Sequence, residues 1–191
     1  MKCHHGIVCL SAVLFALFTA TPVAAEKPRT SKKEVKPAVE LKVRSWKGLQ
    51  KLVAAHKGKV VVVDIWTTTC GTCVEEFPKF AALQKQFPKD KIALISLNCD
   101  YDGIKDKPPE FYRADVTKFL RKQNATFENV MLNIAFIDFL DQVDLSSTPA
   151  VLVYRPNGKL AKRFDNDKAE KLEDEFTIKD VKQQIAKLLK K

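Results

Sequence analysis

The sequence predicts an α/β domain built on a mixed central sheet that is flanked by helices on both faces. Two runs typical of buried strands, residues 59–66 and 91–99, are separated by a run with helical spacing. Near the carboxyl end, residues 148–164 contain two strand-like runs around Asn157-Gly158, a pair that favours a tight hairpin turn. A strand–helix–strand order that ends in an antiparallel hairpin and a helix implies such a mixed sheet.

The first 25 residues have the features of a secretory signal peptide. Lys2 is followed by an apolar stretch over residues 6–20, and the small residues Val23 and Ala25 precede the expected cleavage site. The apolar stretch is shorter than the roughly 20 residues that a membrane-spanning helix needs. We therefore expect export to the periplasm or another extracytoplasmic compartment, whereas an uncleaved segment would leave the protein tethered to a membrane.

The next part of the chain is predicted to be a flexible basic tether over residues 26–38, before a folded domain over residues 39–191. Residues 26–37, EKPRTSKKEVKP, lack apolar periodicity and carry much of the formal net charge of +10. No aromatic residues interleave with these lysines, and an exported protein rarely meets nucleic acid. We expect a monomer without a nucleic-acid partner.

The first half of the domain is expected to contain two strands and two helices. Residues 39–45 are a short strand candidate, and residues 46–58 read as a helix that ends at Gly58. Residues 59–66 are β-branched almost throughout, as expected of a strand buried on both faces. After Cys73 the periodicity becomes helical until Pro88 ends the run, with the apolar positions Phe77, Phe80, Leu83 and Phe87.

The second half begins with the buried strand 91–99 and a polar loop. A helix is expected over residues 111–122, a short strand over 127–132, and then the hairpin. The last helix opens with Thr177 and Asp180 as a capping pair. Its apolar face consists of Ile178, Val181, Ile185, Leu188 and Leu189.

Cys70 and Cys73 lie where the strand 59–66 gives way to a helix, and their spacing fits several kinds of site. A structural zinc ion needs four ligands, and only Cys99 and His56 are left after the leader to complete such a set. Covalent haem requires a histidine where Val74 stands, and a copper carrier would need a wider spacing. A structural disulfide remains open, although closing so short a loop constrains the unfolded chain little.

A redox couple has a physical rationale at this position. The strand-to-helix boundary places the sulfur of Cys70 at a helix amino terminus, where free backbone N–H groups and the helix dipole favour a thiolate. Cys73 follows on the same face of the helix. Cys70 would attack a partner's disulfide, and Cys73 would then resolve the mixed disulfide.

The segment VVVDIWTTTCGTCVEEFPKF resembles the active-site segment of the thioredoxin superfamily, and in particular its exported TlpA/ResA-like thiol-disulfide oxidoreductases. CVEEFP is similar to the C-x-x-E-[FM]-P pattern of that branch, and SSTPAV to its Thr-Pro before the hairpin. The resemblance implies a thioredoxin fold with an extra helix and strand inserted between Cys99 and Thr148. It also implies that Pro149 is cis.

The resemblance also assigns roles to residues around the cysteines. It places Asp64 where the family keeps a buried acid that exchanges a proton with the second cysteine, and burial should raise the pKa of this carboxyl. It places Glu76 in the active site as a second proton handler. Thr148 with Pro149 would pair with the backbone of an extended partner. Trp66 either packs in the core or offers a flat apolar platform beside the sulfurs.

We therefore predict an extracytoplasmic thiol-disulfide oxidoreductase with Cys70, Cys73, Glu76 and Asp64 as catalytic residues. It would need neither a cofactor nor a metal ion. Its partners would be disulfides or dithiols of exported proteins, including apocytochromes in cytochrome c maturation as the resemblance suggests, and a membrane-borne thiol donor if it acts as a reductase. The alternatives are a peroxiredoxin-like thiol peroxidase that uses Thr67 with Cys70 and a non-catalytic binding module.

Overall fold

The structure of the protein, a computed structural model, describes residues 38–190. The predicted signal peptide and nearly all of the predicted tether lie outside the described residues. Within the described part of the chain, no helix is both long enough and apolar enough to cross a membrane.

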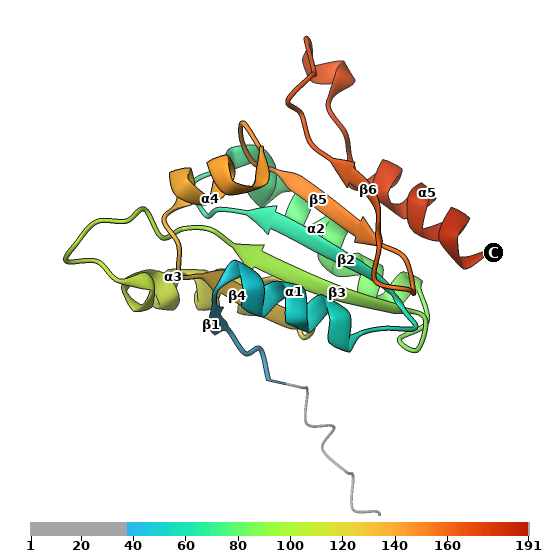
Figure 1. Cartoon of the computed structure of the whole chain (residues 1–191), viewed down its shortest axis with the longest axis horizontal. Coiled ribbons are helices and arrows are strands. Elements are labelled where there is room, and N and C mark those ends of the chain that lie inside the picture. Colours follow the sequence, from blue (N-terminus) through green and yellow to red (C-terminus); the bar gives the residue numbers. More distant parts are fainter. Residues whose placement is uncertain (1–37, 191) are drawn as a thin grey trace, which may run out of the picture. The chain divides into compact units, whose positions relative to one another are not determined.

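A six-stranded mixed sheet forms the centre of the domain, in the order β1-β4-β3-β2-β5-β6 (Figure 1). β1, β4, β3 and β2 are parallel, whereas β5 is antiparallel to both β2 and β6. This confirms the predicted mixed sheet. The strands span Lys42–Arg44 (β1), Val60–Trp66 (β2), Ile92–Asn98 (β3), Glu128–Leu132 (β4), Ala150–Tyr154 (β5) and Leu160–Phe164 (β6).

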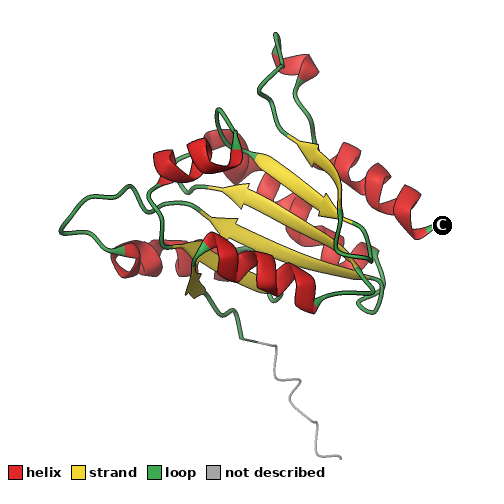
Figure 2. Cartoon of the chain, viewed as in Figure 1, coloured by secondary structure: helices red, strands yellow, loops and turns green. Residues whose placement is uncertain are grey.

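Helices cover both faces of the sheet (Figure 2). As a consequence, every residue of the central strands β2 and β3 is buried. α1 and α4 pack on one face, and α2, α3 and α5 pack on the other. Successive strand residues alternate between the two faces, so Val63 and Ile65 contact the first layer, whereas Val62 and Trp66 contact the second. The helices span Trp46–Ala55 (α1), Gly71–Gln86 (α2), Pro109–Lys122 (α3), Phe136–Val143 (α4) and Ile178–Leu189 (α5).

Local sequence explains where several of these elements begin and turn. The hydroxyl of Ser45 accepts the N–H of Gly48 at the start of α1, and the predicted capping box of Thr177 and Asp180 is present at α5. The predicted hairpin is also confirmed. Its loop spans residues 155–159, in which the Gly158 N–H donates to the Arg155 carbonyl and Gly158 has the positive φ that glycine adopts without strain.

The sequence prediction missed α4, so the insertion between β3 and β5 contains two helices and a strand instead of one of each. α4 has only eight residues, and its N-cap residue Ala135 provides no side-chain hydrogen bond. Its apolar residues do follow helical spacing, and Phe139 and Leu140 are buried against the sheet. Packing against the sheet therefore stabilises a helix that lacks a recognisable start.

Two substitutions in α4 test this account of the insertion. Phe139 is 0% exposed and Ile137 is 71% exposed. Phe139→Ala should lower the free energy of unfolding by about 3–5 kcal/mol because it leaves a cavity, whereas Ile137→Ala should change it by no more than about 0.5 kcal/mol. Urea unfolding monitored by circular dichroism measures both values. Equal effects of the two substitutions would show that α4 is not anchored to the sheet.

Candidate active site

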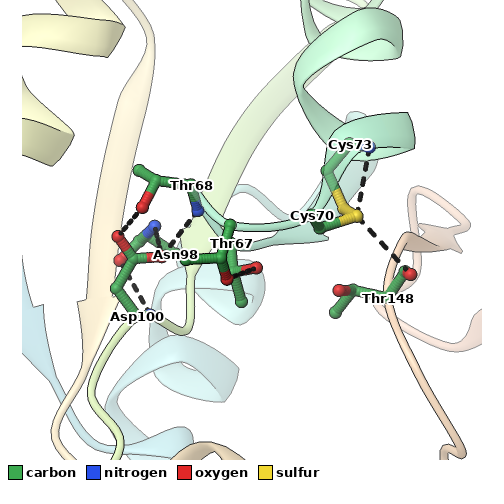
Figure 3. Close-up of a disulfide and its surroundings, with 8 residues drawn as sticks. Thr67, Thr68, Cys70, Cys73, Asn98, Asp100 and Thr148 are labelled. Atoms are coloured by element: carbon green, nitrogen blue, oxygen red, sulfur yellow. Dashed lines mark hydrogen bonds between the residues drawn. A yellow bond between two sulfur atoms is a disulfide. The ribbon is translucent and has the colours of Figure 1, made fainter.

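The sulfur atoms of Cys70 and Cys73 form a disulfide at the amino terminus of α2 (Figure 3). Cys70 is the N-cap residue of this helix, and its Sγ atom accepts the backbone N–H of Cys73 at 3.1 Å. Cys70 is partly exposed, whereas Cys73 is only 2% exposed. Reduction of the bond would therefore leave a reachable sulfur at Cys70 with an N–H group and the helix dipole available to stabilise its thiolate.

The loop before Cys70 is held by Asp100, a residue that the sequence analysis did not single out. The Asp100 carboxylate accepts the backbone N–H of Thr68 at 2.7 Å and the Thr68 hydroxyl at 2.6 Å. The Asn98 amide donates to the same carboxylate at 3.0 Å, and the Asn98 side-chain oxygen accepts the Asp100 N–H. These bonds fix the end of β2 to the end of β3, and so they fix the start of α2.

The segment before β5 reaches Cys70 from the other side. The Thr148–Pro149 peptide bond is cis, as the resemblance implies, and the carbonyl oxygen of Thr148 lies 3.6 Å from the Sγ of Cys70. The sulfur of a disulfide carries no hydrogen, so this approach is a contact in the oxidised protein. In the reduced protein a protonated Cys70 could donate to the same carbonyl. The structure thus brings Thr148 and Pro149 beside the predicted nucleophile.

Asp64 lies in β2 and faces the layer that contains α2, where it is 5% exposed. Burial, and secondarily the negative charge of Glu76, raises the pKa of the Asp64 carboxyl from 3.8 to about 8. The carboxyl is therefore mostly protonated at neutral pH. The protonated form can donate a proton near the working pH, and the carboxylate form can receive one.

Glu76 forms no hydrogen bond with either sulfur, but it joins two helices. Its side chain is 19% exposed and accepts a hydrogen bond from Lys79 on the next turn of α2. Its second oxygen accepts the backbone N–H of Ile178, the first residue of α5, at 3.2 Å. The carboxylate is thus stabilised by a lysine and a helix amino terminus, and its charge acts on Asp64.

Of the two roles considered for Trp66, the structure favours core packing over a platform for a partner. Its ring is 0% exposed and packs between Phe77 and Phe119, with centroid distances of 4.8 and 4.9 Å. The indole N–H donates to the Ser96 hydroxyl at 2.7 Å. A ring in this position supports α2 from beneath and cannot offer a surface to a partner. The sequence left both roles open because a tryptophan next to a site gives the same pattern whether its ring lies on the exposed or the buried side.

Cys99 lies at the end of β3, where it is 1% exposed and forms no disulfide. Burial, followed by the charges of Asp100 and Asp64, raises the pKa of its thiol well above the ordinary value. The residue is therefore a neutral buried thiol. Among residues 38–190, no His, Cys, Asp and Glu side chains gather in a group that could hold a metal ion.

Residues 31–184 of the sequence match the Redoxin family. The chain belongs to the Redoxin family. It is 27% identical over 106 residues to the thiol-disulfide oxidoreductase ResA of Bacillus subtilis, a match that covers 56% of this chain and 52% of ResA. The predicted membership of the thioredoxin superfamily is thereby confirmed, and ResA is one of the proteins that the chain resembles. In these matches the chain spans about half the length of the curated relatives.

Solved structures support the same fold for this Redoxin-family protein. A thiol-disulfide isomerase from Corynebacterium glutamicum superposes with a TM-score of 0.57 at 18% identity, over 82% of this chain and 98% of that protein. A thioredoxin-like superfamily protein superposes with a TM-score of 0.53 at 21% identity, over 73% of this chain and 85% of that protein. The predicted thioredoxin-like fold is confirmed by this similarity.

The raised pKa of Asp64 predicts how the stability of the oxidised protein depends on pH. Folded Asp64 keeps a proton that the unfolded chain releases above pH 3.8, so the wild type should lose stability between about pH 4 and 8 and then level off. Asp64→Asn should remove this component. The difference in free energy of unfolding between the two proteins should grow by up to about 1.4 kcal/mol per pH unit over that window.

Glu76→Gln is the matched variant, because it removes a charge that raises the Asp64 pKa while it preserves the size of the side chain. It should move the upper end of the window to lower pH. Urea unfolding at a series of pH values measures all three proteins, and carbon NMR of the Asp64 carboxyl reports its titration directly. A difference that does not vary with pH would show that Asp64 titrates normally.

Proposed function

We propose that the protein is an extracytoplasmic thiol-disulfide oxidoreductase that exchanges disulfides with other exported proteins. The observation that carries this proposal is the asymmetric pair of sulfurs at the amino terminus of α2. The sulfur of Cys70 is reachable and accepts a helix N–H, whereas Cys73 is buried behind it. The similarity to ResA, whose name describes this activity, supports the same reaction class.

The exchange proceeds in two steps that balance electrons and atoms. The Cys70 thiolate attacks one sulfur of a partner disulfide, which forms a mixed disulfide and releases the first partner thiolate. The Cys73 thiolate then attacks the Sγ of Cys70, which restores the Cys70–Cys73 disulfide and releases the second partner thiolate. Two electrons pass from the protein to the partner, and the same steps run in reverse when a partner dithiol is oxidised.

Asp64 is the proposed proton handler for Cys73. Cys73 must lose its proton before the resolving attack, and a buried thiol does so only with a nearby acceptor. Asp64 faces the same layer as Cys73 and has a pKa near 8, so it exchanges a proton readily near neutral pH. Glu76 would act less directly, since its charge adds to the effect of burial in raising the pKa of Asp64.

The Thr148–Pro149 segment is the proposed docking edge for the partner. An extended partner chain would pair with the backbone of Thr148 and so present its cysteine to Cys70, which lies 3.6 Å from the Thr148 carbonyl. The partners would be exported proteins, with apocytochromes as candidates from the resemblance. In the reducing direction a membrane-borne thiol donor would restore the dithiol.

Two features weigh against the alternative functions. A peroxidase would need the Thr67 hydroxyl free beside Cys70, but Thr67 is 4% exposed and its hydroxyl is paired with that of Thr69 at 3.1 Å. A binding module without chemistry would not need one reachable and one buried sulfur at a helix start. We therefore favour thiol-disulfide exchange over both.

A trapping experiment tests this proposal. Cys73→Ser removes the resolving thiol, so Cys70 should accumulate mixed disulfides with a denatured disulfide-containing protein at close to one partner per molecule. Cys70→Ser should accumulate far fewer, because Cys73 is 2% exposed. Nonreducing gels and mass spectrometry identify the adducts, and peroxide consumption by the wild type serves as a separate assay. Absence of adducts from both variants would indicate a binding module.

A further inference from the structure

The segment between α4 and β5, residues 144–149, contains Thr148. Two charged residues that follow it in the sequence, Arg163 and Asp167, attach it to the rest of the domain. Arg163 in β6 donates through one Nη1 to the carbonyl of Val143 at 3.2 Å and to that of Asp144 at 2.9 Å. Asp167, just after β6, accepts the backbone N–H of Ser146 with both carboxylate oxygens, at 3.1 and 3.2 Å. β6 lies beside β5 in the sheet (Figure 1), and the pairing of Phe164 with Val151 brings the end of β6 close to this segment.

These charged groups are partly withdrawn from solvent and hold one another in place. Arg163 Nε donates to Asp165 at 2.7 Å, and Arg163 Nη2 lies 3.8 Å from Asp167. The side chains of Arg163, Asp165 and Asp167 are 33%, 16% and 15% exposed. The rigid guanidinium fork thus joins two carboxylates and two backbone carbonyls at once, which a lysine could not do.

The attachments lie at the points where the chain changes direction. Val143 is the last residue of α4 and Asp144 is its C-cap, with a positive φ of 54°. The carbonyls at this helix end have no partner within the helix, so Arg163 supplies the hydrogen bonds and the positive charge that a helix carboxyl terminus favours. Asp167 then fixes Ser146, two residues before Thr148, whose carbonyl contacts Cys70.

We propose that Arg163 and Asp167 are positioning residues for disulfide exchange, because they hold the Thr148 segment in the place where a partner chain pairs beside Cys70. This inference rests on the proposed function. Neither residue forms a hydrogen bond with the sulfurs. Loss of either one should release the Thr148 segment and so impair exchange with an extended polypeptide. It should leave the intrinsic reactivity of the Cys70–Cys73 disulfide unchanged.

Asp167→Ala tests this role through two reactions of the oxidised protein. A short unstructured peptide with one central cysteine attacks Cys70 and uses the docking edge, whereas dithiothreitol attacks the same sulfur without it. The second-order rate constant for the peptide should fall by about tenfold to a hundredfold, the scale expected for an ångström-sized displacement of a positioned group. The rate constant for dithiothreitol and the reduction potential should not change.

Three further variants make the outcome decisive. Glu170→Ala removes an equal charge from an exposed residue of the same loop and should leave both rates unchanged. Asp167→Asn keeps one acceptor for the Ser146 N–H and should give a smaller fall in the peptide rate. If Asp167→Ala does not fold, this variant tests the positioning role of Asp167 in its place. Arg163→Lys keeps the charge but loses the fork, and should lower the peptide rate selectively.

Two results would overturn the inference. One is a peptide rate in Asp167→Ala and Asp167→Asn that equals the wild-type rate, and the other is an equal fall in the peptide and dithiothreitol rates. Both differ from failure of the proposed function itself, which would appear as a wild-type disulfide that forms no mixed disulfide with the peptide. Thermal melting of each variant checks that the comparison is made between folded proteins.

Discussion

The hydrogen bond from the Cys73 N–H to the Sγ of Cys70 is the interaction on which the rest of the site depends. It places a sulfur at the helix amino terminus, where serine or aspartate is usually the capping residue and where the backbone N–H groups have no partner within the helix. A thiolate gains more from this position than a thiol does, because the bond and the helix dipole both favour negative charge. The chemistry proposed for the protein therefore begins with the geometry of one helix terminus.

The sheet holds three chain segments around the amino terminus of α2. The parallel pair β2 and β3 ends together, and Asp100 at the end of β3 fastens the loop that leads into α2. The antiparallel β5 starts at the same edge, so Thr148 arrives opposite Cys70. Beneath them Trp66 fills the core and Asp64 keeps its proton, which gives the buried side of the site both rigidity and a neutral acid.

Much of this arrangement follows from local sequence, and the remainder does not. The strand runs, the hairpin glycine and the capping box of α5 are local signals, and the structure contains each of them. The short helix α4 has no cap, so tertiary packing decides it. Asp100 and Asp167 could not be recognised because their partners, Thr68 and Ser146, are distant in the sequence. The position of Trp66 in the sequence places it near the site, but it does not show on which side of α2 the ring lies.

The most direct measurement of the central claim is the pH dependence of alkylation of the reduced protein, with the modified cysteine identified by mass spectrometry. Iodoacetamide should react first with Cys70, and the rate should reach half its maximum at a pH clearly below the value of about 8.5 that is typical of a free cysteine. Cys73 and Cys99 should react slowly, since both are buried. A Cys70 that titrates like a free thiol, or that reacts no faster than Cys73, would contradict the account.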